Sequence, residues 1–181
     1  MSQSDLEFRA LRETIATRGT VRMVLFPATI VAWAVIAGAS LIFPTDLPIT
    51  AIFPLAVLVA GFEAIHALHV GVERIGRYVQ VYYESREDGP LWETTAMKVG
   101  PALPGGGIDP LFTVVFICAT VINLIPALLP SPSRVQLGVL GLLHVAFLVR
   151  LVRARGAAAR QRAVELESYR AISSEHPAAK T

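Results

Sequence analysis

The sequence predicts an all-helical membrane protein with four transmembrane helices, because three observations agree. The 181 residues are 54% hydrophobic and 17% charged, and their mean hydropathy is +0.56, a composition typical of membrane proteins. Four apolar segments, at 21–43, 48–72, 110–129 and 135–152, each approach the ~20 residues that cross a hydrocarbon core about 30 Å thick. Fifteen of the sixteen Lys and Arg residues lie on one side of these segments, and only Arg134 lies on the other.

This charge asymmetry predicts the orientation of the chain. Four crossings place both termini on one side of the membrane, and the positive-inside rule makes that side cytoplasmic. We therefore expect a multi-pass protein of the plasma (inner) membrane, forming one helical domain over 1–181. The clustered basic residues would meet anionic lipid headgroups, each contributing up to ~1 kcal/mol, which favours lipid over nucleic acid as a partner. The single cysteine, Cys118, excludes an intrachain disulfide.

The N-terminal 20 residues predict an amphipathic helix at the cytoplasmic surface. Ser4 and Glu7 have the spacing of a capping box, and apolar residues then recur at helical spacing as far as Gly19. Such a helix would rest its apolar face on the headgroup region. An Ala-Gly-Ala sequence at 37–39 resembles a signal-peptide cleavage site, but the acidic residues before this span favour an uncleaved first helix.

The second and fourth helices are predicted to continue into the cytosol. Helix-compatible residues extend the second from Pro48 to about Glu87, or about 60 Å at 1.5 Å per residue. A cytoplasmic loop at 88–109 then contains one surface turn around Trp92 and a flexible glycine run. Asp109 and the following proline are typical of a helix start, and 130–133 predicts a tight outer turn. The fourth helix would continue into the tail at 153–181, ending near Ile172.

Polar and small residues form two neighbouring stripes on the second helix. Glu63 and His66 lie three residues apart, and His69 and Glu73 four apart, on a face that also includes Arg77. Because small residues allow helices to approach closely, we expect the small stripe to pack against another helix while Leu58, Ile65 and Leu68 face lipid. The stripe consists of Ala56, Ala60, Ala64, Ala67 and Gly71.

Glu63 and His66 are the ionisable residues of this helix that lie clearly within the membrane. Counted from Pro48, Glu63 lies about 22 Å deep, and Arg150 of the fourth helix reaches the same depth. An ion pair between Glu63 and Arg150 is the simplest expectation, although Arg150 points away from the glycine face of its helix and could instead extend to the interface. We therefore predict a structural polar network containing Glu63, His66, His69, Glu73, Arg77 and Arg150.

Several functions stay open at this point. An accessory or scaffold protein, homo-oligomeric or bound to a membrane-protein partner, is the expectation, with no catalytic residues, metal or cofactor assigned. The first alternative is a small oligomeric transporter or proton-coupled permease that uses Glu63 and His66. The second is a metal-binding protein, although one Glu-x-x-His pair falls short of a bundle di-iron site. Haem between His66 and His144 is disfavoured by a mismatch in depth of roughly 13 Å, and we expect His144 to bond Asn123 or Thr120 instead.

Overall fold

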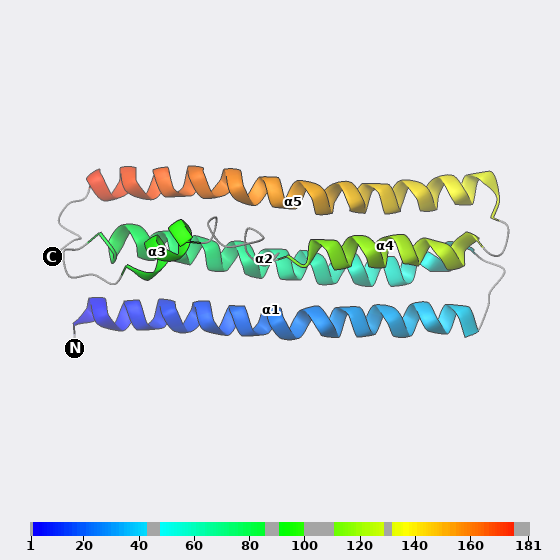
Figure 1. Ribbon diagram of the computed structural model, residues 1–181, viewed down its shortest axis with the longest axis horizontal. Helices are drawn as coiled ribbons and strands as arrows, with labels where there is room; N and C mark the ends of the chain where they lie inside the picture. The colour runs from blue at the N-terminus through cyan, green and yellow to red at the C-terminus, as the bar shows by residue number, and fades with distance from the viewer. Residues whose placement is uncertain (1, 43–47, 86–90, 100–110, 129–131, 176–181) are drawn as a thin grey trace. The chain divides into compact units, whose positions relative to one another are not determined.

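The computed structural model describes residues 2–42, 48–85, 91–99, 111–128 and 132–175, and this part of the chain is helical with no strand (Figure 1). The all-α prediction is therefore confirmed. The elements in chain order are α1 (Gln3–Ile42), the 3-10 helix η1 (Pro48–Ala51), α2 (Ile52–Tyr82), α3 (Trp92–Val99), α4 (Thr113–Leu128) and α5 (Arg134–Glu175).

Three of these helices are long and apolar enough to cross a membrane. They are α1, α2 and the Arg134–Ala154 part of α5, whereas α4 is apolar but has only 16 residues. Large apolar side chains are exposed along α1, α4 and α5, including Val35, Ile122 and Leu142. Extensive apolar exposure is typical of surfaces that contact a membrane or another protein.

The N-terminal segment differs from its prediction, because residues 3–42 form one continuous helix. Gly19 does not end the helix: a lone glycine costs only ~1 kcal/mol in a helix interior, and its neighbours on both sides favour helix. The capping box also lies two residues earlier than expected. Asp5 N donates to Ser2 Oγ at 3.1 Å, while Ser2 N donates to Asp5 Oδ2 at 2.9 Å.

The other helix ends follow the sequence more closely. The fourth predicted helix continues past Gly156 and ends at Glu175, and a second capping box, between Ser133 and Gln136, begins it. The expected surface turn around Trp92 is the two-turn helix α3. The predicted helix start at Asp109 lies outside the described residues.

Contacts divide the chain into two compact units. Unit 1 consists of Met1–Val21, Leu68–Asp109 and Gly156–Thr181, and unit 2 consists of Arg22–Ala67 and Pro110–Arg155. Helices α1, α2 and α5 contribute residues to both units.

The core of unit 2 is built around Phe62 of α2. Its ring meets Phe116 of α4 edge-on at 5.4 Å between centroids and Phe147 of α5 at 5.9 Å. Leu58 and Ile65, one turn before and one turn after Phe62, are completely buried beside it. Spacings of three and four residues therefore put the large apolar side chains of α2 inside the unit.

This arrangement contradicts the predicted orientation of α2. Leu58 and Ile65 are buried, whereas Ala56, Ala60, Ala64 and Ala67 are exposed, so the alanine stripe does not pack inside unit 2. Large side chains fill this interior because each makes many more dispersion contacts than an alanine. Gly71 lies in unit 1 and does face a neighbouring helix, since an added Cβ would clash with the Arg18 guanidinium of α1.

The close helix approach in unit 2 occurs at Gly61. A Cβ built on Gly61 would lie 2.8 Å from Thr29 Cβ of α1 and nearer still to the Cγ2 and Oγ1 of that threonine. The Thr29 hydroxyl donates to Leu25 O at 2.8 Å, which holds the threonine in place. Glycine at position 61 is therefore required for contact between α1 and α2.

Candidate functional site: two polar networks

The polar stripe of α2 contributes to two separate networks, one in each unit. Glu63 and His66 lie in unit 2, where they meet Arg150, while His69, Glu73 and Arg77 lie in unit 1.

In unit 2, Arg150 Nη2 donates to Glu63 Oε2 at 2.8 Å, which is the ion pair that equal depth predicts. The same Nη2 lies 3.4 Å from His66 Nδ1, and the guanidinium lies over the Phe62 ring at 5.6 Å. Both ends of the pair are well exposed, with side-chain exposures of 43% for Glu63 and 38% for Arg150. A charged pair thus lies partly exposed on the surface of a unit whose exposed side chains are mainly apolar.

The exposed surface around Glu63 has a distinct composition. Phe53 is the one large apolar side chain of α2 that is exposed among the described residues, whereas α1, α4 and α5 expose many valines, leucines and isoleucines. The exposed face of α2 instead presents its alanines. Ala56, Ala60 and Ala64 follow one another at intervals of four residues, which is the spacing of helix pairs that pack closely in membranes.

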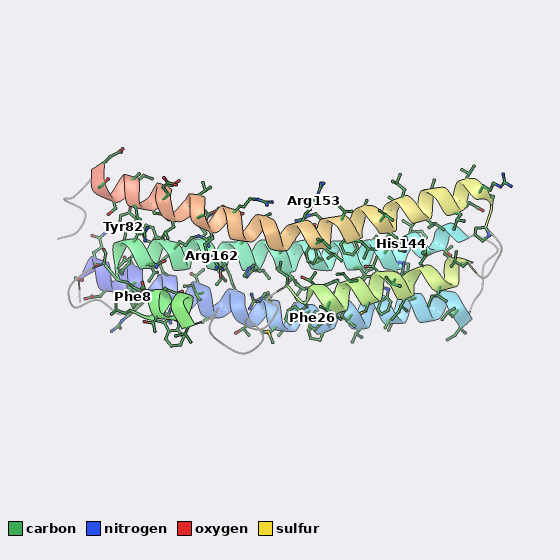
Figure 2. All side chains as sticks on the ribbon, turned by 45° about the horizontal axis from the view of Figure 1, so that its top comes forward. Phe8, Phe26, Tyr82, His144, Arg153 and Arg162 are labelled. Atoms are coloured by element: carbon green, nitrogen blue, oxygen red, sulfur yellow. The ribbon has the colours of Figure 1, made fainter. Side chains whose placement is uncertain are left out.

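A second network in unit 2, largely buried, is centred on Asn123 of α4. Its Nδ2 donates to Ala51 O at 3.0 Å and lies 3.1 Å from His144 Nε2, and its Oδ1 accepts Trp33 Nε1 at 3.1 Å. His144 Nδ1 is 2.7 Å from Leu140 O and is therefore the protonated nitrogen, which leaves Nε2 to accept from Asn123. The expectation that His144 bonds Asn123 is confirmed. In Figure 2, His144 is directed toward the other helices, while Arg153 of the same helix points away from them.

Asn123 makes more contacts than the sequence predicts. It was expected only as a partner of His144, yet it joins residues of α1, η1, α4 and α5 and is 1% exposed. An asparagine in the middle of a strongly apolar helix is the signal that identifies such a residue, because its amide must be satisfied within the protein.

In unit 1, Arg77 of α2 is the centre of an ion-pair network. Its Nε donates to Glu165 Oε2 of α5 at 2.9 Å, and its Nη1 donates to Glu73 Oε2 at 3.1 Å. Arg162 of α5 also donates to Glu73, through Nη2 at 2.7 Å, and Arg74 donates to Glu165. Arg77 is 4% exposed. The network therefore links α2 to α5 through a buried guanidinium and two shared carboxylates.

Glu165 and Arg162 were missed from the sequence. Their signal was their spacing on the extension of the fourth helix, three residues apart with charges opposite to those of Glu73 and Arg77. Partial burial would raise the pKa of Glu165, but hydrogen bonds from Gln161 and Arg77, with the charge of Arg77, outweigh it and lower the pKa below its ordinary value. The Glu73 carboxylate is bonded to two arginines, Arg77 and Arg162.

Two carboxylates hold helix α3 against the other helices of unit 1. Glu84 Oε1 and Oε2 accept the backbone N–H groups of Glu93 and Thr94, at 2.6 and 2.8 Å, and so cap the N-terminus of α3. Glu93 itself pairs with Arg12 of α1 at 2.8 Å. Burial raises the pKa of Glu93 even though the charge of Arg12 opposes this.

Aromatic side chains complete the packing of unit 1. Tyr78 contacts Tyr82 at 4.6 Å and Tyr169 of α5 at 5.9 Å between ring centroids, and Phe8 of α1 packs on Tyr83 at 5.3 Å. The Tyr78 hydroxyl donates to Glu7 Oε1 of α1 at 3.0 Å. Burial and this hydrogen bond raise the pKa of Tyr78 to about 12. The tyrosines thus connect all three long helices of the unit.

Within the residues that the structure describes, no three His, Cys, Asp or Glu side chains come close enough to hold one metal ion. Comparison of the chain with protein-family models, with curated proteins and with solved structures finds no match. The function must therefore be inferred from the residues themselves.

Proposed function

We propose that this protein is a four-span scaffold of the plasma membrane that self-associates within the bilayer through the exposed face of α2. In this proposal unit 2 lies in the hydrocarbon region, both termini are cytoplasmic, and the charged helices of unit 1 are available to a cytosolic partner. The observation that carries the proposal is the Glu63–Arg150 ion pair on the outer surface of unit 2.

The energetic argument concerns the surroundings of this pair. Charged groups that face lipid cost at least a few kcal/mol, and such residues in membrane helices normally face other protein or a water-filled cavity. Glu63 and Arg150 are about two-fifths exposed on unit 2. A protein surface covering them would exclude lipid from both charges, and the neighbouring alanines would allow that surface to approach closely.

A second copy of this chain is the occupant that fits best. The face carries one negative and one positive group side by side, so a two-fold axis near them can place Glu63 of one copy opposite Arg150 of the other. The alanines at 56, 60 and 64 match the spacing of self-associating membrane helices.

Cysteine cross-linking in native membranes tests this proposal. Exposed Cys118 of α4 is first replaced, to give Cys118→Ser. Ala60→Cys is then compared with Val145→Cys, which is exposed on α5 and serves as the control. Oxidation should give disulfide-linked dimers from Ala60→Cys and monomers from Val145→Cys. Equal cross-linking at both positions, or none at Ala60, would contradict the proposal, and a cross-link to another protein would identify a hetero-partner.

Accessibility to a membrane-impermeant thiol reagent tests the orientation. In the same cysteine-free background, Ser133→Cys should be labelled from outside intact cells, whereas Thr95→Cys and Ser174→Cys should be labelled only after lysis. External labelling of Thr95→Cys would reverse the proposed topology.

Transport is the second candidate function, and Glu63→Gln separates it from scaffolding. The amide keeps the size of the side chain and can still accept from Arg150. A scaffold should retain its oligomeric state in this variant. Loss of a proton-coupled flux in reconstituted vesicles, with the protein still folded, would instead assign Glu63 to a relay.

A further inference from the structure

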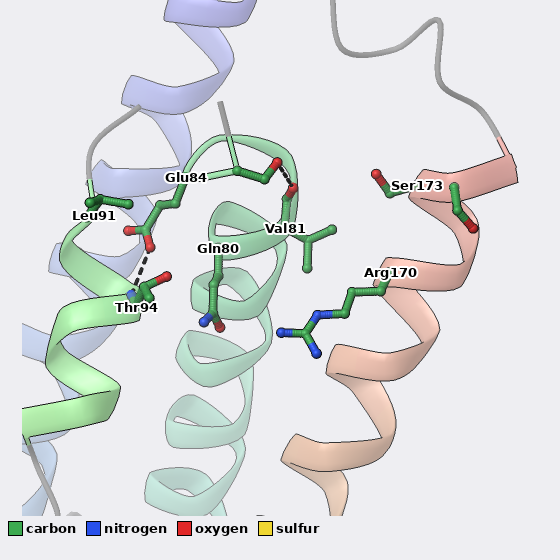
Figure 3. Close-up of a pocket in the computed structure, with 9 residues that line it drawn as sticks. Gln80, Val81, Glu84, Leu91, Thr94, Arg170 and Ser173 are labelled. Carbon is green, nitrogen blue, oxygen red and sulfur yellow. Dashed lines mark hydrogen bonds between the residues drawn. The ribbon is translucent and has the colours of Figure 1, made fainter. Parts of the chain in front are cut away.

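Unit 1 contains a cavity of about 360 Å³ between the end of α2, the start of α3 and the last turns of α5 (Figure 3). This volume is at the lower end of the range that holds small-molecule ligands. Side chains from all three segments line the cavity: Gln80, Val81, Glu84, Ser85, Leu91, Thr94, Arg170, Ser173 and Ser174.

Two donors in this cavity have no partner among the residues that the structure describes. Ser173 is 4% exposed, and its buried hydroxyl makes no hydrogen bond. Arg170, three residues earlier on α5, makes no hydrogen bond or ion pair with the described residues, and Figure 3 shows its guanidinium extending toward Gln80. An unsatisfied buried hydroxyl costs about 1–3 kcal/mol, so a ligand that accepts from Ser173 would recover this energy.

The Glu84 carboxylate, which lines the cavity, repels an anion less than an isolated carboxylate would. Both oxygens of Glu84 accept backbone N–H groups at the start of α3, from Glu93 and Thr94. These amides carry the positive end of the helix dipole and partly compensate the negative charge. Gln80 offers a further amide donor, while Val81 and Leu91 provide an apolar wall.

We infer that this cavity binds a small organic anion, whose carboxylate or phosphate group is held by Arg170 and Ser173. A guanidinium can donate two parallel hydrogen bonds to either group. The hydroxyl of Ser173 supplies a further donor in the same cavity, and the apolar wall accommodates a short carbon skeleton. The cavity lies in unit 1 and its lining includes no residue of the α2 face proposed for self-association, so the two inferences can fail separately.

Isothermal titration calorimetry of the full chain in an uncharged maltoside detergent tests the inference. The probes are inorganic phosphate and succinate, titrated at constant ionic strength against chloride. Arg170→Gln should weaken binding roughly tenfold or more, because it removes charge-assisted hydrogen bonds, and Ser173→Ala should weaken it about three- to tenfold. Arg160→Gln, an equal charge change at an exposed position of α5 outside the cavity, is the matched control and should bind as wild type.

Nanodiscs distinguish a free anion from a lipid headgroup. Phosphate is titrated into protein in phosphatidylcholine discs, with and without phosphatidylglycerol. If headgroups fill the cavity, phosphatidylglycerol should weaken phosphate binding to the wild type; if the ligand is free, both lipids should give the same affinity. Absence of saturable binding of either probe, or equal weakening by Arg170→Gln and Arg160→Gln in folded protein, would overturn the inference.

Discussion

The two units hold their helices together by different means. Unit 2 relies on a phenylalanine-rich core and on uncharged hydrogen bonds around Asn123. Unit 1 relies on ion pairs around Arg77 and on tyrosine contacts between α1, α2 and α5. The three long helices contribute to both units, so the same helix is stabilised by one set of interactions over part of its length and by another set over the rest.

Under the proposed topology, this difference follows from the solvent that would surround each unit. In water, exposed ion pairs change the stability of the fold little. A network around a buried arginine fixes the positions of the side chains that it joins. In hydrocarbon, neutral amide and imidazole groups can be fully satisfied within the protein, whereas charges are expensive. An ion pair such as Glu63–Arg150 therefore resembles the interactions of unit 1 but differs from the uncharged interactions of unit 2. The contrast is what makes their exposed surface a candidate for contact with another copy.

The strongest test of the contrast removes the centre of the uncharged network. Asn123→Leu keeps a similar volume but leaves Trp33 Nε1 and Ala51 O without their partner. We expect the free energy of unfolding to fall by roughly 2–4 kcal/mol. Each unsatisfied group costs about 1–3 kcal/mol, and a hydrogen bond within a membrane contributes less than this. Unfolding by dodecyl sulfate in mixed micelles, followed by helical circular dichroism, measures it.

Thr120→Val is the matched control for Asn123→Leu. Thr120 is also buried on α4, but among the described residues its hydroxyl bonds only to Phe116 O of the same helix. This variant should lose less than about 1 kcal/mol. Similar losses in the two variants would mean that Asn123 acts by packing alone.

The second test concerns the close approach at Gly61. Gly61→Ala places a methyl group against Thr29, and overpacking of this kind costs about 1–3 kcal/mol. The control is Gly138→Ala on α5, where nothing lies within 4 Å of the added Cβ and the better helix propensity of alanine should slightly stabilise. Thr29→Ala in the Gly61→Ala background should restore part of the loss. Destabilisation without any rescue would show that the contact with Thr29 is not its cause.

Sequence reasoning succeeded where one rule dominated and failed where two rules competed. Hydropathy predicted the helices, and equal depth predicted the Glu63–Arg150 pair. The orientation of α2 was wrong because two rules applied to one helix: small residues favour close packing, but large side chains fill an interior better. Gly61 provides the close approach between helices and Phe62 fills the interior, so the alanines lie exposed on the surface of unit 2.

The network of unit 1 and its cavity could not be predicted, because they depend on side chains brought together from distant parts of the sequence. Glu165 is 88 residues from Arg77, and no local pattern specifies that pairing. Nor does the sequence show that Ser173 lacks a partner, since burial without a hydrogen bond is a property of the folded chain.

The third test addresses the charged network of unit 1. Glu165→Gln should destabilise by about 1–2 kcal/mol at neutral pH, since the remaining Glu73 still compensates Arg77. The control is Glu167→Gln, an exposed glutamate two residues later on α5, which should change the stability little. Equal effects of the two variants would indicate that net charge, rather than the network, is responsible.

The pH dependence of this effect has a defined sign. Because the folded-state pKa of Glu165 lies below its ordinary value of 4.5, the unfolded chain takes up a proton first as the pH falls. The stabilisation is present above pH 4.5 and is lost as the pH falls through the folded-state pKa. The difference in unfolding free energy between wild type and Glu165→Gln should therefore shrink below pH 4.5. A difference that grows on acidification would contradict the assignment.

The smallest expected effect concerns the tyrosine contacts of unit 1. Tyr78→Phe removes the hydrogen bond to Glu7 but keeps the ring packed against Tyr82 and Tyr169, so the loss should be about 0.5–1.5 kcal/mol. Because the pKa of Tyr78 is raised to about 12, the variant should also lose an ionisation in that region when the phenolate absorbance is titrated. Glu7→Gln retains an acceptor without the charge, so it should lower this pKa while costing less stability than Tyr78→Phe. An alkaline titration left unchanged by Glu7→Gln would show that Glu7 and Tyr78 do not interact, and that α1 is held in unit 1 by contacts such as Arg12 with Glu93 instead.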